Sequence, residues 1–441
     1  MTIPYDGAIA DVSVRARFSD LAVHLRSADL FANGMRGTPL IARTSGALGR
    51  DSAGNVYEFP HSRTAIEYFD LDNDGIYETP AFCFDGARTN LCERASALGS
   101  WTATNLARTA QVGLGDLPLW RINDTDAVNQ GTLDSPAGTV MRFTVGGNGV
   151  ALFYIAKGDS PAAGGSSLVV RDTTNNANRL NLGVTWVGNT PSINPVGGTH
   201  LWQRKTGLTY AGKEVWEIAG KCTGTLTGAT DHIVRYIAAT TAAQQGDLYV
   251  GPAHIEDVAT YPLPLVLNGG TGSASYSRDE WRYPHDGYCG AGSILLDLIE
   301  RGTILENGAR VFTLGNNAGG TPEVTVDVSG GKYRLVHHNG TTSVSSALTG
   351  TMPSVGDRFQ LYGYWDATGA VRLSMLLAGT WQHAAVSGAN AYPRNTGWAG
   401  WPGAAYFTFG HPYANRQALR VIEAKVATAA LSQAQLAGAF G

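Results

Sequence analysis

The sequence predicts an all-β fold: two antiparallel β-sandwich modules in tandem, preceded by an irregular N-terminal region that we expect to anchor the protein. Glycine is abundant, with 56 of 441 residues, whereas charged residues make up only 15%. Glycine supplies the positive φ angles that tight turns require. From Met141 onward, short runs of β-branched and aromatic residues recur between Gly, Asn and Asp clusters, with no long helical periodicity between them. This pattern is typical of short antiparallel strands.

The strand-like runs fall into two groups that predict the domain organisation. The first group ends with DLYVGPAHIED, and the second begins with SILLDLIE. Between them lies a segment rich in Pro and Gly, which indicates a linker. Within the first group, Leu180, Leu182, Val184 and Trp186 alternate and should share one face of a strand. The predicted units are an N-terminal attachment region at 1–92, a first sandwich at 93–262, a linker at 263–284 and a second sandwich at 285–441.

Local signals also predict hairpins and two short helices outside the sandwiches. Three turn-forming stretches at 51–55, 72–75 and 85–86 predict a small meander of hairpins. Residues 19–31 could form an amphipathic helix capped by Ser19, and residues 430–440 a second helix capped by Ser432. The Asp366–Gly369 stretch should close a hairpin in the second module.

Composition excludes several classes of protein. The formal net charge is −4 and no Lys/Arg cluster is present, so nucleic acid is not an expected partner. No run of about 18 apolar residues and no secretory signal pattern occur, so we expect neither membrane insertion nor export. The four cysteines form no C-x-x-C pair and are expected to be buried free thiols. A disulfide between Cys83 and Cys92 across a hairpin is the alternative.

The N-terminal third carries a recognisable succession of motifs. It comprises ART at 42–44, DSAGNVYEF at 51–59, DLDNDGIYETP at 70–80 and DGARTNL at 85–91, followed by Trp101, LYVGPAHIED and the Tyr261-Pro262 step. This arrangement resembles minor virion proteins of tailed bacteriophages, in which a GARTNL tag opens a carbohydrate-binding-module-like jelly roll. From about residue 285, the pattern is similar to concanavalin A-like and laminin-G-like lectin sandwiches, including the closing LRVIEAKVATAALSQAQL.

The resemblance implies a structural component of the virion, synthesised in the host cytoplasm and exposed as a tail fibre, spike or head-decoration protein. It implies adhesion to host-surface carbohydrate, contacts with other virion proteins and a symmetric homo-oligomer, with a trimer as the first expectation. Two alternatives remain open. One is a purely structural cement protein of capsid or tail that binds no glycan, and the other is a polysaccharide depolymerase.

Aromatic side chains in loops are the candidate glycan platforms, because an aromatic face packs on an apolar ring surface while its polar edge stays solvated. Gly and Pro around NTGWAGWPG indicate a loop, so Trp398 and Trp401 are the first candidates. The remaining candidates are Tyr392, Trp381 and Trp281. For each of them, a place in the sandwich core is the competing interpretation.

A calcium site is the one cofactor that the sequence suggests. Asp70, Asp72, Asp74 and Gly75 in DLDNDG fit the first half of an EF-hand loop, and Glu78 could partly substitute for the bidentate Glu that such a loop has where this sequence has Ala81. A plain Asx-rich turn explains the same residues. Otherwise we expect no cofactor.

No motif of a known catalytic type was found, so the chain is expected not to be an enzyme. Its nearest carboxylate pair, Asp297 and Glu300, has an odd spacing that places the two on opposite faces of a strand. Adjacent His337 and His338 also face opposite sides and are interpreted as surface residues.

Overall fold

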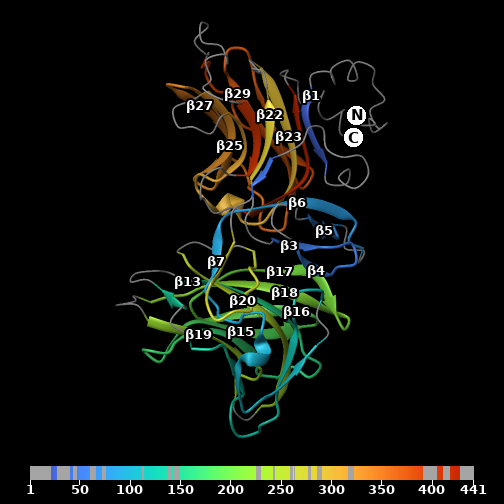
Figure 1. The fold of residues 1–441 in the computed structure, drawn as a ribbon, viewed down its shortest axis with the longest axis vertical. Coiled ribbons are helices and arrows are strands. Elements are labelled where there is room, and N and C mark those ends of the chain that lie inside the picture. Colours follow the sequence, from blue (N-terminus) through green and yellow to red (C-terminus); the bar gives the residue numbers. More distant parts are fainter. Residues whose placement is uncertain are drawn as a thin grey trace.

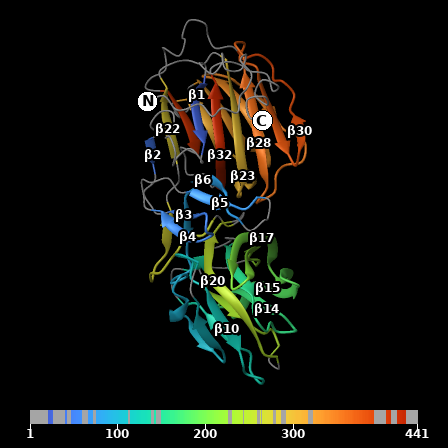
Figure 2. The ribbon, with the colours of Figure 1, turned by 90° about the vertical axis from the view of Figure 1, so that its right-hand side faces the viewer.

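The computed structural model describes 21–26, 40–42, 47–59, 66–71, 76–111, 114–137, 141–143, 149–224, 230–241, 244–258, 262, 264–276, 280–285, 291–315, 322–390, 405–410 and 418–427. These residues form two β-sandwich lobes stacked along the long axis of the molecule, with strands β3 to β6 between them (Figures 1 and 2). The predicted all-β fold with antiparallel sandwiches is confirmed. No helix in the described part of the chain has the length and apolar character needed to span a bilayer.

The first sandwich consists of two sheets, which we call sheets I and II. The strands of sheet I, in spatial order, are β17 (Thr199–Tyr210), β18 (Lys213–Lys221), β13 (Gly149–Lys157), β20 (Gly246–Asp257), β10 (Trp120–Asp124) and β9 (Ala107–Ala110). Those of sheet II are β16 (Thr190–Gly197), β15 (Ala177–Val187), β14 (Ser166–Asp172), β19 (Thr230–Ile237), β11 (Thr132–Asp134) and β8 (Thr102–Thr104), with β12 (Arg142–Phe143) beside β19. A 3-10 turn, η3 (Leu98–Ser100), precedes β8.

Alternating side chains fill the core between sheets I and II. The predicted alternation in β15 is confirmed, because Leu180, Leu182 and Val184 are fully buried and Trp186 packs against the same cluster. Trp101, which follows the GARTNL tag, is 1% exposed and stacks on Tyr236 at a centroid distance of 5.6 Å. The expected aromatic after the tag is therefore a core residue.

The second sandwich also consists of two sheets, sheets III and IV. The path of sheet III is β30 (Thr380–His383), β29 (Val371–Leu377), β28 (Arg358–Trp365), β23 (Gly292–Glu300), β32 (Ala418–Ala427), β6 (Thr79–Asp85), β5 (Ile66–Phe69), β3 (Ala47–Arg50) and β4 (Val56–Phe59), with β1 (Leu21–Arg26) also beside β32. Sheet IV contains β2 (Leu40–Ala42), β22 (Glu280–His285), β31 (Ala405–Gly410), β24 (Arg310–Gly315), β25 (Pro322–Ser329), β26 (Lys332–Asn339) and β27 (Ser343–Ala347). A second 3-10 turn, η4 (Thr303–Leu305), follows β23.

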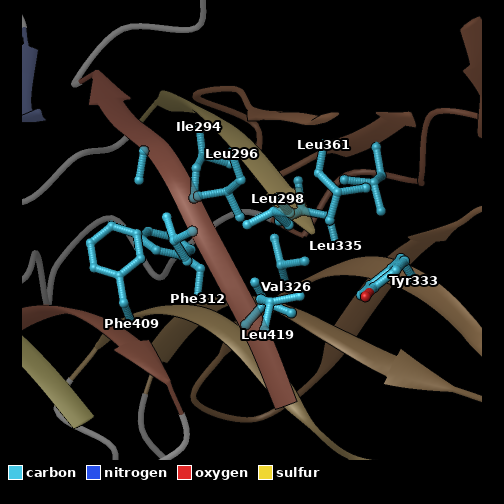
Figure 3. Packing of buried hydrophobic residues seen from close by; sticks show 14 of the residues in the cluster. Ile294, Leu296, Leu298, Phe312, Val326, Tyr333, Leu335, Leu361, Phe409 and Leu419 are labelled. Carbon is cyan, nitrogen blue, oxygen red and sulfur yellow. The ribbon is translucent and has the colours of Figure 1, made fainter. Parts of the chain in front are cut away.

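Figure 3 shows the core of the second sandwich, where residues of both sheets interdigitate. Leu296 and Leu361 come from sheet III, and Phe312 and Val326 from sheet IV; all four are at most 1% exposed. The hairpin predicted at 366–369 is confirmed, since Asp366 N–H donates to the Ala370 carbonyl at 3.0 Å. Its side chain also accepts the Thr368 N–H at 2.8 Å, as short Asp side chains commonly do in turns.

The domain boundaries differ from the predicted ones. Strands β1 to β6 of the predicted attachment region pair into the sheets of the second sandwich, where β6 lies between β5 and β32. The predicted linker contains β21 (Ala274–Tyr276) and most of β22, so the boundary at 284 falls inside a strand of sheet IV. The β1–β32 and β6–β32 pairings join segments more than 300 residues apart, and local patterning carries no signal for such contacts.

The predicted helix at 19–31 is wrong. Residues 21–26 form strand β1, which pairs antiparallel with the C-terminal half of β32, Leu25 opposite Ala424. The pairing satisfies the backbone of LAVHLR in a sheet, and this tertiary environment outweighs a weak helical preference. The predicted helix at 430–440 lies outside the described residues.

The three predicted turns behave differently from one another. Residues 51–55 close the β3–β4 hairpin, in which Asp51 caps the turn by accepting from Ala53 N–H and Asn55 N–H. The turn at 72–75 lies outside the described residues, although its flanking strands β5 and β6 pair antiparallel. The third turn forms no hairpin. After Asp85 the chain leaves sheet III and forms β7 (Arg88–Asn90), which pairs with β21.

The tag residue Asn90 fixes this crossing strand to the first sandwich. Its side chain is fully buried and uses all its hydrogen-bonding capacity. The amide nitrogen donates to the carbonyls of Ala253 at 3.0 Å and Val266 at 2.8 Å. The amide oxygen accepts from Cys92 N–H and Ile255 N–H, both at 3.0 Å. The GARTNL tag is thus a structural element at the junction of the two lobes.

The β3–β4 hairpin also contacts the first sandwich. Val56 N–H donates to Leu114 O at 3.1 Å, and Val56 O accepts from Asp116 N–H at 2.6 Å. Gly115 has φ +67°, and a Cβ there would lie 2.1 Å from Val56 O, so only glycine permits this approach. The hairpin covers the outer face of sheet I, where Val56 packs in a cluster with Leu117 and Tyr154.

Cys83, Cys92 and Cys222 are buried free thiols, as predicted, so Cys83 and Cys92 do not form the alternative disulfide. Burial raises the pKa of the Cys92 and Cys222 thiols and keeps them protonated. Cys289 lies outside the described residues.

Candidate functional site

The outer face of sheet III carries a group of aromatic side chains in the described part of the second sandwich. Odd-numbered residues of β28, such as Leu361 and Trp365, point into the core. Side chains alternate along a strand, so Tyr362 and Tyr364 point the other way. Register extends this outer face to the sheet edge, because Leu376 of β29 lies opposite Trp381 of β30.

We call Tyr362, Tyr364, Trp381 and His383 the aromatic row. The Tyr362 and Tyr364 rings lie 6.2 Å apart between centroids, and the Trp381 and His383 rings lie 6.1 Å apart and nearly parallel, at 4°. Ser374 lies between the two pairs, opposite Tyr362 on one side and His383 on the other. Tyr362 and Ser374 are only 3% and 1% exposed, so the accessible ring surface of the row comes from Tyr364, Trp381 and His383.

Polar atoms border these rings. His383 Nδ1 and Ser374 Oγ are 2.9 Å apart. Burial raises the pKa of Tyr362, so its phenol stays protonated. Tyr362 packs with Leu295, whereas Tyr364 and Trp381 are partly buried at the margin of the same cluster, and His383 is exposed.

Two kinds of charged group lie beside the aromatic row: Asp297 and Arg358 pair with each other, whereas Arg372, opposite Tyr364, donates to the Ala384 carbonyl at 3.3 Å. Asp297 is 5% exposed and accepts from Arg358 through both carboxylate oxygens, at 3.0 and 2.7 Å, and from Gln360 at 3.3 Å. Such a bidentate pair leaves little net charge for a ligand. The surface can stack on a flat, partly apolar ring and exchange hydrogen bonds with hydroxyl groups, which is the chemistry of saccharide binding.

The structure places the predicted glycan candidates unequally. Trp381 belongs to the aromatic row, but it lies in strand β30 rather than in a loop. Trp281 lies in β22, opposite Phe409, so its predicted loop position is also wrong. Trp398, Trp401 and Tyr392 lie outside the described residues.

Sequence reasoning missed Tyr362, Tyr364 and His383. The signal was present in the alternation of QLYGYW and WQH, in which every second residue is polar or aromatic. Alternation alone did not reveal which face of the strand would be covered, because that depends on the neighbouring sheet.

Of the predicted calcium ligands, Asp70 and Glu78 lie in the described residues. Glu78 is exposed, and Asp70 lines a cavity that also contains Arg50 and Arg204. Asp72 and Asp74 lie outside the described residues. No group of three or more His, Cys, Asp or Glu side chains suited to a metal occurs in the ranges given above.

The two histidines of β26 face opposite sides, as predicted, but His337 is not a surface residue. It is fully buried, and its Nδ1 lies 2.8 Å from the Gly369 carbonyl of the neighbouring hairpin. Burial lowers the pKa of His337, so the ring stays neutral near pH 7. The Asn339-Gly340 pair lies in the turn that follows, which is closed by a hydrogen bond from Asn339 N–H to Thr342 O at 3.0 Å.

Asp297 and Glu300 occupy different environments, as their spacing predicted. Asp297 is on the outer face with Arg358. Glu300 is fully buried, where its carboxyl accepts from Tyr333 Oη, from Gly302 N–H at 2.6 Å and from Ile304 N–H at 3.2 Å. Burial outweighs these hydrogen bonds and raises the pKa of Glu300 to about 7. The two carboxyl groups do not form a paired acid and base.

The raised Glu300 pKa predicts a distinct pH dependence of stability. Between its ordinary value of 4.5 and about 7, the folded chain holds a proton that the unfolded chain releases. The free energy of unfolding should therefore fall across this window as pH rises, by on the order of 3 kcal/mol. Urea titrations at a series of pH values give the free energy of unfolding at each pH, and Glu300→Gln should make that free energy less dependent on pH between 4.5 and about 7. The same pH dependence in the wild-type and variant chains would contradict this assignment.

Comparison with known proteins identifies no family for this chain. No protein-family model matches it, and no curated protein matches it. Among solved structures, it is similar to domains LG4-5 of the mouse laminin α1 chain, with 11% identity, a TM-score of 0.19, and coverage of 79% of this chain and 92% of that one.

Two glycoside hydrolase structures show similarity of the same order. One is a bifunctional GH43-CE protein of Bacteroides eggerthii, with 10% identity, a TM-score of 0.22, and coverage of 91% of this chain and 56% of that one. The other is an engineered GH43 glycoside hydrolase with endo-xylanase and exo-arabinofuranosidase activity, with 11% identity, a TM-score of 0.20, and coverage of 85% and 76%. With TM-scores this low, none of the three bears on function.

Proposed function

We propose that this chain is a non-enzymatic, surface-exposed component of a tailed-phage virion that binds glycan of the host surface through the aromatic row. The observation that supports glycan binding is the group of accessible rings of Tyr364, Trp381 and His383 near the edge of sheet III, beside the neutralised Asp297–Arg358 pair. The proposed location in a virion rests on the resemblance of the GARTNL region to phage proteins.

Weak binding at one such surface suits a protein displayed in many copies. A shallow, partly exposed platform buries little of a ligand, so the affinity per site is expected to be low. Display on a particle, with a homotrimer as the proposed unit, converts weak sites into strong attachment through avidity.

Trp381→Ala should weaken saccharide binding about three- to tenfold, since a specific aromatic contact contributes ~0.5–1.5 kcal/mol. The measurement is a glycan array that identifies a saccharide, followed by calorimetric titration of wild-type and variant chains. Tyr57→Ala is the matched control, because Tyr57 is an aromatic with 42% exposure on the distant β4 strand. Equal losses in both variants would argue against the aromatic row.

The particle assignment has its own test. Antibody labelling of intact phage particles should place this chain on the outer surface, whereas absence from purified particles would refute the assignment. If antibodies label the particles but the chain binds no saccharide on the glycan array, the results would favour the structural cement role. Release of reducing ends from host capsule would favour the depolymerase.

A further inference from the structure

A group of buried charges lies where the two sandwiches meet. Five guanidinium groups gather there with three carboxylates, an excess of two positive charges among the described residues. The members are Arg50, Arg88, Arg204, Arg301 and Arg420, with Glu67, Asp85 and Glu217. Uncompensated charge is costly to bury, because neither water nor a counter-charge stabilises it.

Most of these groups are satisfied by each other. Arg204 donates twice to Glu217, at 2.8 Å for each contact. Arg420 donates to Glu67 at 2.7 Å and to Asp85 at 2.7 Å. These pairs use the carboxylate oxygens, so little acceptor capacity remains for the other guanidinium groups.

Arg301 and Arg50 each have an unused donor. The Arg301 side chain is 9% exposed, and its nearest carboxylate contacts are Glu67 at 3.9 Å and Glu217 at 4.0 Å, too long for hydrogen bonds. Its Nε has no hydrogen-bond partner. Arg50 reaches Glu67 at 3.3 Å through Nη2, but its Nε is also without a partner.

Both side chains line a cavity of about 50 Å³ between the sandwiches. This is space for about three water molecules or one small anion. Thr206 and Arg204 of β17 contribute the wall from the first sandwich. A second cavity of about 300 Å³ shares Arg50, Arg204, Thr206 and Arg301 with the first, so the two adjoin.

We call the 50 Å³ cavity the inner cavity and the 300 Å³ cavity the outer cavity. The outer cavity is lined by both positive and negative side chains. Lys205 lies on its wall together with Asp70 and Glu214. Burial raises the pKa of Glu214, which favours its neutral form. Arg50, Arg204 and Arg301 line both cavities, so positive charge exceeds negative charge in each, and the smaller cavity has the size of one small ion.

We propose that the inner cavity binds a small tetrahedral oxyanion, of the phosphate or sulfate class, through Arg50 and Arg301. Planar guanidinium groups match the oxygen geometry of such ions and can donate two hydrogen bonds each. Since Arg50 and Arg301 belong to the second sandwich and Arg204 to the first, the bound ion links the two lobes. This site is separate from the aromatic row and does not depend on the proposed function.

The test uses the full chain and inorganic phosphate, sulfate and chloride at matched ionic strength. Phosphate or sulfate should raise the melting temperature saturably, with one ion per chain by calorimetric titration, and chloride should not. A ligand at 100 times its Kd stabilises by about 2.7 kcal/mol, so the shift is measurable. Arg301→Met should weaken oxyanion binding at least tenfold. Arg142→Met, at an exposed arginine of the first sandwich, should leave binding unchanged.

Several outcomes would overturn the proposal. They are no saturable response in the wild-type chain, equal affinity in Arg301→Met, or a response to chloride equal to that for phosphate. If Arg301→Met fails to fold, the test is ³¹P NMR of phosphate with the wild-type chain. Phosphate that binds the chain gives a broadened signal, and sulfate that competes for the same site sharpens it again. Broadening that sulfate reverses supports the site, and its absence refutes it.

Discussion

Asn90→Ala is expected to lower the free energy of unfolding by at least about 3 kcal/mol. The substitution removes four hydrogen bonds of a fully buried amide. It leaves two backbone N–H groups and two carbonyls without partners, each at a cost of ~1–3 kcal/mol when water cannot reach them. Urea unfolding monitored by tryptophan fluorescence measures the effect.

Thr89→Ala is the matched control for this prediction. Thr89 is the neighbouring residue of β7, and its hydroxyl makes one exposed hydrogen bond to Ser275 at 3.0 Å. Its loss should cost no more than about 0.5 kcal/mol, as for other surface changes. A small effect of Asn90→Ala, similar to that of Thr89→Ala, would mean that the tag does not hold the junction.

Arg420→Met should destabilise the chain by about 3–5 kcal/mol, the range found when one partner of a buried ion pair is removed. Arg420 is 1% exposed and joins Glu67 of β5 to Asp85 of β6. Without it, Glu67 keeps only the 3.3 Å contact with Arg50 and the longer contact with Arg301. Arg142→Met removes a solvent-exposed pair and should cost less than about 1 kcal/mol.

The same variant should change the response to acid. Burial opposes ionisation of Glu67, but Arg420 and Arg50 more than offset it and hold its pKa below the ordinary value of 4.5. Glu67 therefore contributes stability that is present above pH 4.5 and lost as pH falls through its lowered pKa. Arg420→Met should remove this contribution, which urea titrations below pH 4.5 would detect. If the free energy of unfolding falls equally in the wild-type and variant chains as pH drops below 4.5, the role assigned to Arg420 is contradicted.

The sequence predicted the sandwich strands well where both faces of a strand are buried, or where polar and apolar residues alternate clearly along it. Strands β13, β14, β20 and β23 are examples, and their long apolar runs stand between turn residues. Edge strands were missed. β16 contains two prolines and is mostly exposed, which suits an edge position but resembles a loop in sequence.

Long-range pairing could not be predicted from local patterns. β6 reads as a plausible strand, but nothing near it indicates that β32 is its partner. The buried charges at the junction were missed for the same reason, because their members are scattered from Arg50 to Arg420 and each looks like an ordinary surface residue alone. Trp381 was found because tryptophan is conspicuous, whereas its neighbours in the aromatic row required the register of three strands.

The most direct test of saccharide binding at the aromatic row is an NMR titration of the full chain with a saccharide identified on the glycan array. Binding at the aromatic row should shift the Trp381 indole N–H and the backbone amides of β28 to β30, with saturation at one ligand per chain. Shifts confined to the first sandwich or to sheet IV, with the Trp381 indole unmoved at saturation, would contradict the proposed binding surface.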